Sequence, residues 1–221
     1  MTHLLKNQDI WLNINKPANI SSAKVVAIIK RITGAKKVGH AGTLDPFATG
    51  VLPIALNKKT KESKNLLNCD KEYFFQIKWG EFRDSDDIDG KITEKSSKRP
   101  SNHQISVIMT NFIGKITQKP SKYSAIKING KRAYDLARHN IEFEMPEREV
   151  FINKIILLDN NDNLASFYVS CSKGTYVRTI SRNICELLGV CGYVCKLTRI
   201  RVGNFYLKST ISLDLLKYKH Y

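Results

Sequence analysis

The sequence predicts a fold of mixed α and β structure, because strand-like and helix-like hydrophobic patterns both recur along its 221 residues. Alternation of apolar and polar residues, or β-rich runs beside turn-forming residues, predicts strands at 10–14, 73–79, 149–158 and 164–171. Apolar residues at helical spacing follow Ser21 and Ser101, which are both good N-caps. Since 42% of the residues are hydrophobic, the chain has enough apolar surface for a core.

The ends of these elements are indicated by local residues. Ser21 or Ser22 begins a helix that ends at Gly34, and Ser101 begins one that stops at Gly114. We also predict a short helix reaching Leu67, a helix to about residue 188, a strand over 196–202 and a last helix ending near residue 218.

The charge predicts a polyanionic partner. Lys and Arg number 36 against 20 Asp and Glu, which gives a net charge of +16. Nucleic acid is the expected partner; an anionic membrane surface and a merely solvated basic surface are the alternatives. No run approaches the roughly 20 apolar residues that span a bilayer, and the first six residues show no signal-peptide pattern. We therefore expect a cytoplasmic protein.

Metal-binding patterns are weak. Cys191 and Cys195 are four apart with Cys185 nearby, but no CxxC pair exists, so ordinary buried thiols are expected rather than a zinc site. The run 84–90 resembles a calcium loop, yet aligning its glycine puts Ser96 where the bidentate Glu belongs. We interpret it as an acidic turn between strands.

The segment 39–53 contains one acid among three glycines and two prolines. Pro46 and Pro53 argue against a regular helix or an inner strand there. Asp45 is the only carboxylate between Asp9 and Glu62. A lone acid on such a loop is a candidate nucleophile or base, and the alternative is a turn aspartate that bonds its own backbone.

The same segment carries a longer motif. It contains every fixed position of Gly-His-x-Gly-Thr-Leu-Asp-Pro-x-Ala-x-Gly-x-Leu-Pro. This string resembles the signature of the tRNA pseudouridine synthase B family, which isomerises the T-loop uridine (uridine-55) of tRNA to pseudouridine. The resemblance implies that Asp45 is the catalytic aspartate.

Further segments are similar to motifs of that family. They are 15–21, where Asn19 replaces the usual glycine, Thr60-Lys61, Asp70-Lys71-Glu72-Tyr73, Pro120–Lys127 and Ser172–Thr179. The resemblance gives Tyr73 the role of stacking on the target base, with possible help in removing the C5 proton, and gives Arg178 that of the cation beside Asp45. It places Lys61 in a supporting position and Tyr176 near the base or the Asp45–Arg178 pair.

Two more residues take roles from the resemblance. Leu197 would form an apolar wall of the pocket. His40 would occupy the space vacated by the flipped nucleotide, although a lone histidine in a glycine-rich loop is more often structural. The reaction exchanges no electrons and loses no group, so no redox cofactor and no metal is expected.

The segment 115–139 is basic, with seven Lys and Arg residues and one acid. Two tyrosines lie among them, a combination that suits RNA, whereas the alternative is a solvated hairpin and helix. The resemblance identifies 115–146 as an insertion that grips the T-arm. The candidate RNA-binding residues are Lys119, Lys122, Lys127, Lys131 and Arg132.

The resemblance covers the chain from about Leu12 onward and implies the pseudouridine synthase catalytic fold. This is an α/β (α+β) fold with a mixed, largely antiparallel central sheet and flanking helices. We expect one catalytic domain over 1–221, acting as a monomer, without the small C-terminal RNA-binding domain that many members carry. The sequence leaves open whether Asp45 attacks the sugar or the base or takes the C2′ proton. The alternative functions are a tRNA-folding chaperone that binds the T-arm and a synthase of the same fold acting on another RNA.

Overall fold

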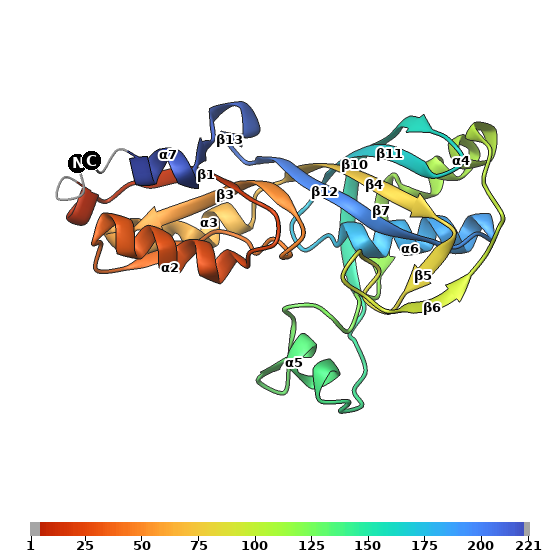
Figure 1. The fold of residues 1–221 in the computed structure, drawn as a ribbon, viewed down its shortest axis with the longest axis horizontal. Helices are drawn as coiled ribbons and strands as arrows, with labels where there is room; N and C mark the ends of the chain where they lie inside the picture. The colour runs from red at the N-terminus through yellow and green to blue at the C-terminus, as the bar shows by residue number, and fades with distance from the viewer. Residues whose placement is uncertain (1–4, 219–221) are drawn as a thin grey trace. The chain divides into compact units, whose positions relative to one another are not determined.

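The computed structural model describes residues 5–218, which form two compact units (Figure 1). The first unit contains the described residues up to Tyr73 and those from Leu197 onward, and the second contains Phe74–Lys196. The first four residues, which belong to the segment expected to lack a signal peptide, lie outside the described part. Within residues 5–218, no helix combines the length and the apolar character needed to cross a membrane.

The first unit is a mixed sheet with helices. Its elements are β1 (Trp11–Lys16), α2 (Ser22–Thr33), β2 (Val38–His40), β3 (Thr49–Leu56), η1 (Asn57–Glu62), α3 (Ser63–Leu67), the start of β4 (Lys71–Trp79), the end of β12 (Gly192–Val202), β13 (Phe205–Tyr206), η3 (Leu207–Ser209), β14 (Ile211–Ser212) and α7 (Leu213–Tyr218). The strand order is β14-β1-β3-β12, with β2 added to β3 and β13 to β12. β1 and β2 run antiparallel to β3, whereas β12 runs parallel to it.

The core of this unit lies between α2, α7 and the strands β1 and β3. Val25, Ile29 and Ile32 form the buried face of α2, as the helical spacing predicted. The Ser21 hydroxyl accepts a hydrogen bond from the Lys24 amide at 3.1 Å, and Gly34 closes the helix in a left-handed conformation. Asn19, which replaces the usual glycine, also has a positive φ of 63°.

The expectation that Pro53 excludes an inner strand is wrong. Pro53 lies inside β3, which pairs with β1 along one side. Along the other side, β12 pairs with β3 at Thr49 and Gly50, and β2 pairs with it from Ile54 onward. Pro53 lies between these two stretches, and its carbonyl on that side accepts from the Ala41 amide at 3.0 Å. Its missing N–H therefore removes no bond from the sheet.

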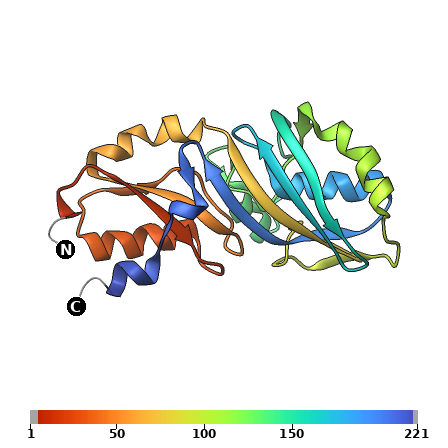
Figure 2. The same cartoon turned by 90° about the horizontal axis from the view of Figure 1, so that it is seen from above.

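The second unit is a largely antiparallel sheet with two main helices. Its further elements are β5 (Glu81–Arg83), β6 (Ile92–Lys95), α4 (Asn102–Met109), η2 (Thr110–Phe112), β7 (Gly114–Gln118), β8 (Lys127–Ile128), β9 (Lys131–Arg132), α5 (Ala133–Arg138), β10 (Arg148–Asn160), β11 (Leu164–Cys171) and α6 (Val177–Leu188). The strand order is β12-β4-β11-β10-β7, and Figure 2 shows the long strands of this series side by side. The mixed, largely antiparallel sheet predicted for the chain is confirmed.

Helix α4 contacts both α6 and β10, and a stacked pair of phenylalanines fills the sheet side of this core. The rings of Phe75 on β4 and Phe167 on β11 are 5.0 Å apart. β12 begins at Gly192, four residues before the predicted start at Lys196, and Gly192 packs closely on its neighbours. A Cβ there would lie 2.7 Å from Ile77 and 2.8 Å from the Cys185 sulfur. A glycine next to a cysteine gives no strand pattern in the sequence.

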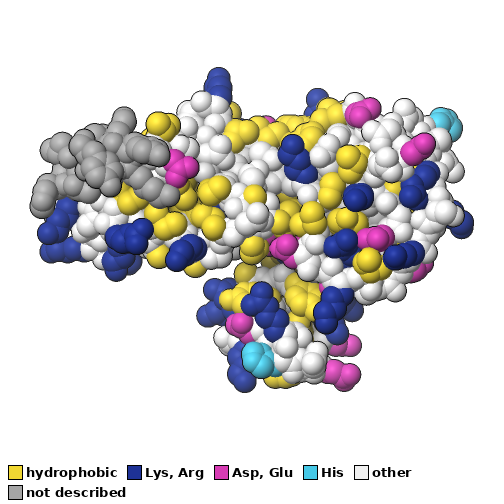
Figure 3. All heavy atoms as spheres, in the orientation of Figure 1, with side chains coloured by type: hydrophobic (Ala, Val, Ile, Leu, Met, Phe, Trp, Pro, Cys, Tyr) yellow, Lys and Arg dark blue, Asp and Glu magenta, His cyan; other side chains and the backbone are white. Residues whose placement is uncertain are grey.

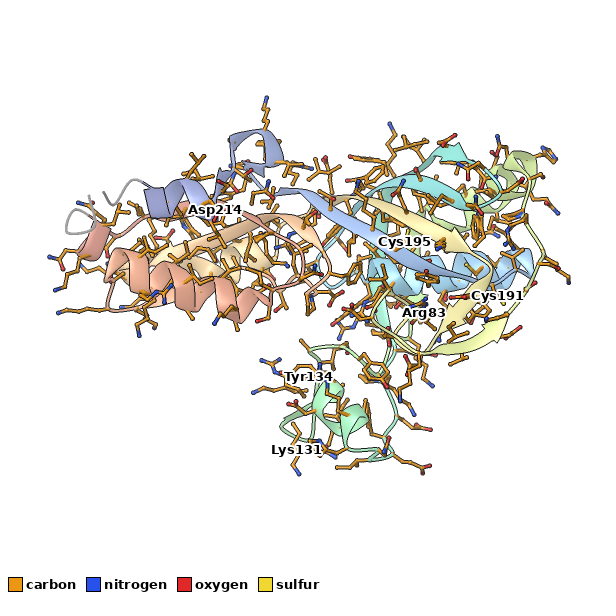
Figure 4. The ribbon with its side chains drawn as sticks, in the orientation of Figure 1. Arg83, Lys131, Tyr134, Cys191, Cys195 and Asp214 are labelled. Atoms are coloured by element: carbon orange, nitrogen blue, oxygen red, sulfur yellow. The ribbon has the colours of Figure 1, made fainter. Side chains whose placement is uncertain are left out.

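The thiols are mostly interior. Cys171, Cys185 and Cys191 are buried, and Cys69 and Cys195 are partly exposed. Figure 4 labels Cys191, which directly precedes β12, and Cys195, which lies on that strand. Burial raises the pKa of the Cys185 and Cys195 thiols above the usual value, so they are protonated at neutral pH.

Candidate active site

The loop between β2 and β3 carries Asp45, which is partly exposed. The Ala48 amide donates to the Asp45 carbonyl at 3.1 Å, so residues 45–48 form a turn with Pro46 at its second position. Ser22, in the first turn of α2, fixes the residue before Asp45. Its hydroxyl donates to the Leu44 carbonyl at 3.0 Å and accepts from the Leu44 amide at 2.9 Å. The start of α2 therefore holds the loop at both polar groups of Leu44.

Lys16, the last residue of β1, is fully buried beside this loop. Its Nζ donates to the carbonyls of Pro17 (2.8 Å), Ile20 (2.7 Å) and Pro46 (2.9 Å). The pKa of Lys16 is lowered to about 8, mainly by burial; the charge of Asp45 opposes this shift, and the charge of Arg199 adds to it. Lys16 is therefore mostly protonated at pH 7, and its charge acts on Asp45.

Arg199 on β12 is a second buried cation of the same unit. It donates from Nε to the Val51 carbonyl at 2.8 Å and from Nη2 to the Gly42 carbonyl at 3.0 Å. Nη1 makes a longer bond of 3.4 Å to the Thr43 carbonyl. Burial lowers the pKa of Arg199, whereas a hydrogen bond to Tyr73 and the charge of Asp45 raise it. Two buried cations thus lie within electrostatic reach of the lone acid.

The other predicted site residues of this unit have distinct surroundings. Tyr73 on β4 is buried and hydrogen-bonded to Arg199. Leu197 is buried two residues before Arg199, hence on the same side of β12. Lys61 lies exposed in η1. The first unit therefore links Asp45 and Tyr73 through Arg199, while the roles of Leu197 and Lys61 stay predictions.

His40, the last residue of β2, is half-buried. Burial and the nearby charge of Arg199 lower the pKa of its imidazole, so it is neutral at pH 7. Its Nδ1 is buried and has no hydrogen-bond partner among residues 5–218. The stacking role predicted for His40 is not tested by these contacts.

The second unit holds Arg178 in the first turn of α6, 3% exposed. Its Nη1 lies 2.9 Å from the Ser85 carbonyl and 3.3 Å from Oδ2 of Asp87. Its Nη2 donates to the Tyr123 carbonyl at 3.1 Å. The acidic run 84–90, predicted as a turn between strands, joins β5 to β6 and supplies the first two of these groups.

One turn further along α6, Arg182 pairs with Oδ1 of Asp86 at 2.8 Å. Burial raises the pKa of Asp86 to about 7, although both arginines oppose the shift. Two consecutive acids of the turn are thus bound by two arginines of one helix face.

Tyr176 is the N-cap of α6 and is tied to the end of β7. The Gln118 amide group accepts from the Tyr176 N–H at 2.9 Å and donates to its carbonyl at 3.2 Å. The Arg148 guanidinium lies 5.5 Å from the centre of the Tyr176 ring. Because Gln118 is fully buried, these bonds fix where α6 begins.

The basic segment forms a hairpin and a short helix. Asn129 and Gly130 both have positive φ, as a two-residue hairpin turn requires, and they join β8 to β9. The five candidate RNA-binding residues, Lys119, Lys122, Lys127, Lys131 and Arg132, are all exposed. Figure 3 shows Lys and Arg side chains around this segment with apolar side chains among them, and Figure 4 labels Lys131 and Tyr134 there.

The sequence analysis missed three buried polar residues, Lys16, Arg199 and Gln118. A signal existed for the two cations: Lys16 continues the buried positions Leu12 and Ile14, and Arg199 follows Leu197 at the same spacing. Gln118 gives no such signal, because it is buried by a partner 58 residues away. Asp45 and Arg178 belong to different units, and their pairing stays a prediction.

Solved structures define the class of fold. A chain titled as part of a Cbf5–Nop10–Gar1 complex matches with a TM-score of 0.77 and 29% identity, over 100% of this chain and 57% of that one. Another, an H/ACA RNP bound to a substrate RNA containing 2′-deoxyuridine, matches with a TM-score of 0.72 and 28% identity, over 95% and 53%. The chain thus spans a little over half of these solved chains and has the pseudouridine synthase fold.

The family follows from the sequence matches. Residues 30–177 match the model of the TruB family pseudouridylate synthases (N terminal domain). A tRNA pseudouridine synthase B of Ehrlichia ruminantium is 48% identical over 212 residues, 95% of this chain and 72% of that relative. The chain belongs to the TruB family of pseudouridylate synthases, enzymes that isomerise uridine in tRNA.

Proposed function

We propose that this chain converts the T-loop uridine of tRNA, uridine-55, to pseudouridine, with Asp45 as the catalytic carboxylate. The observation that carries the proposal is the local geometry of Asp45. It lies on a loop whose backbone is bound by two buried cations, Lys16 and Arg199, and whose sequence matches the family signature at every fixed position. Such a loop holds a reacting group in a fixed position before substrate arrives.

The chemistry needs few groups. The bond from ribose C1′ to uracil N1 breaks, the base turns, and a bond forms from C1′ to C5; the C5 proton is lost and N1 gains one. Asp45 acts at the nucleotide as nucleophile or as base at C2′, and the charges of Lys16 and Arg199 favour its ionised form. Arg178 adds a third cation, and Tyr73 stacks on the uracil.

A folded T-loop hides its uridine, so the nucleotide must be flipped out. His40, neutral at pH 7, replaces it in the RNA stack, while Leu197 and Tyr176 line the pocket and Lys61 supports it. The insertion 115–146 grips the T-arm through its exposed cations. We further propose that the enzyme acts on tRNA in the cytoplasm. We propose a monomer, because one chain supplies every residue named.

The main test is tritium release from tRNA transcripts labelled at uracil C5. We expect release by wild type, a loss of at least about 10⁴-fold in Asp45→Asn, and none when the T-loop uridine is replaced. Asp162→Asn, an exposed aspartate in the β10–β11 turn, is the matched control and should keep wild-type activity. Binding without release by wild type would contradict the catalytic proposal and favour the T-arm-binding chaperone; release that persists without the T-loop uridine would favour another target.

The insertion is tested by the salt dependence of binding. Lys131→Gln and Arg132→Gln should each weaken tRNA binding several-fold and reduce the slope of log K against log salt by about one. Lys30→Gln, on the exposed side of α2, is the control. Unchanged slopes in both insertion variants, measured by filter binding at several salt concentrations, would exclude phosphate contacts by these residues.

A further inference from the structure

Arg199 binds the catalytic loop on both sides of Asp45. Its contacts are the carbonyls of Gly42 and Thr43, which precede the aspartate, and that of Val51, which follows it. Because Arg199 is 1% exposed, the three carbonyls have exchanged water for one guanidinium. A planar group with five fixed donors sets the spacing of its acceptors, which a flexible ammonium group does not.

The same guanidinium also reaches Tyr73. Arginine only donates hydrogen bonds, so the Tyr73 hydroxyl oxygen accepts in this pair. The tyrosine is then fixed at its Cα by strand β4 and at its hydroxyl by Arg199. With both ends held, the long axis of the ring is placed before a base arrives.

The backbone of Arg199 is fixed as well. It pairs with Gly50 where β12 runs beside β3. A Cβ on Gly50 would lie 2.3 Å from the Arg199 carbonyl oxygen, and Gly50 has a φ of 102°. Only glycine permits this approach, so the point from which the Arg199 side chain extends is set by the sheet.

From these contacts we infer that Arg199 is a positioning residue that holds the Asp45 loop and the Tyr73 ring in one fixed arrangement. The inference rests on the proposed function, since it concerns the same site. Arg199 acts through Asp45 and Tyr73 and does not itself touch the reacting atoms. Nothing in its sequence context, an arginine on a strand of a basic protein, assigned it this role.

The test replaces the guanidinium of Arg199 by an ammonium group, which keeps the positive charge. Arg199→Lys should remain folded and bind tRNA within threefold of wild type, while the single-turnover rate of tritium release falls by about 100-fold. The matched control is Arg201→Lys, two residues further on the same strand, where the partly exposed guanidinium pairs with Glu72 at 2.6 Å. Its release rate should stay within threefold of wild type.

The unequal effect on rate and binding separates positioning from a general loss of fold, which would lower both together. If Arg199→Lys does not fold, Tyr73→Phe decides, because it removes only the oxygen that accepts from Arg199. We expect this variant to fold and to release tritium more slowly than wild type. If Arg199→Lys does fold, the same change in its background should have no further effect, since the interaction between Arg199 and Tyr73 is already lost.

The outcomes are distinct from those of the proposed function. If wild type releases no tritium, the proposed function fails and the inference fails with it. If wild type is active and Arg199→Lys releases tritium within threefold of Arg201→Lys, the inference alone is overturned. It is also overturned if the effects of Tyr73→Phe and Arg199→Lys are fully additive.

Discussion

The two units use cations in different ways. In the first unit, Lys16 and Arg199 each donate to three backbone carbonyls around the Asp45 loop. In the second, Arg178 and Arg182 each pair with a carboxylate of the turn 84–90. A carbonyl carries no net charge, so the first unit keeps two positive charges near Asp45, the one acid of its loop. In the second unit, the arginine charges are neutralised by the carboxylates of the turn 84–90, and these ion pairs order the turn.

This difference separates two tasks. Cations bound to carbonyls fix the backbone and leave their field to act on Asp45, whereas arginines bound to acids join α6 to the segment after β5. Loss of a cation in the second unit leaves a buried charge unbalanced. Loss of one in the first leaves only neutral acceptors unpaired. Variants of the two units that remove similar numbers of hydrogen bonds should therefore differ in the free energy of unfolding.

The largest effect is expected for Arg178→Met. It strips Asp87 of its buried cation, so the free energy of unfolding should fall by about 3–5 kcal/mol. Tritium release should fall by at least about 10²-fold, since a charge proposed to act at the site is lost. Arg182→Met, the control on the same helix face, should lose only about 1 kcal/mol, because Arg182 is 39% exposed and Asp86, whose pKa is already about 7, can take up a proton when the cation is lost. If urea unfolding shows the same loss of unfolding free energy in both variants, the buried and the partly exposed arginine contribute equally to stability, which contradicts the prediction.

A smaller effect is expected for Gly50→Ala in the first unit. The positive φ should account for about 1 kcal/mol and the close approach to Arg199 for about 2 more. Gly130→Ala is a matched control, because Gly130 also has a positive φ but no atom lies within 4 Å of the added Cβ. If urea unfolding gives both variants the same loss, the contact between β3 and β12 is not tight.

The smallest effect is a pH dependence at Lys16. Its folded-state pKa of about 8 lies below the usual 10.5, so between these values the folded chain binds fewer protons than the unfolded one. Unfolding free energy must therefore rise with pH in this window and fall as pH drops through 8. Relative to Lys16→Met, wild type should gain about 1 kcal/mol between pH 7.5 and 9. A difference that is constant with pH, in parallel urea unfolding curves, would show that Lys16 titrates normally.

Much of the architecture could be predicted from local sequence patterns. The helix after Ser21, its end at Gly34 and the strand beginning near Tyr73 all depend on neighbours within a few residues. The prediction for Pro53 was wrong because a proline is tolerated in β3 only where no neighbouring strand needs its N–H. Which strands flank β3 at that point depends on residues that are distant in the sequence.

The candidate site was only partly predictable for the same reason. Asp45 and Tyr73 lie in motifs, so the sequence pointed to them directly as candidate residues, and their roles stay predictions. Lys16 and Arg199 are buried because distant carbonyls converge on them, and Arg199 reaches Gly42 across 157 positions. The strand spacing places both cations at buried positions, but lysine and arginine are exposed by default, and the distant carbonyls that permit their burial have no local signature.

The hairpin of the insertion is held largely by its own neighbours, which has a consequence for engineering. The Ala133 amide bonds the Ile126 carbonyl and the Tyr134 amide bonds the Ser124 carbonyl, while the Asn129-Gly130 turn sets the register. Upstream of it, Gln118 and the Tyr123 carbonyl hold Tyr176 and Arg178. A graft that exchanges only residues after Ser124 would leave those anchors intact, so this hairpin can be replaced without disturbing the start of α6.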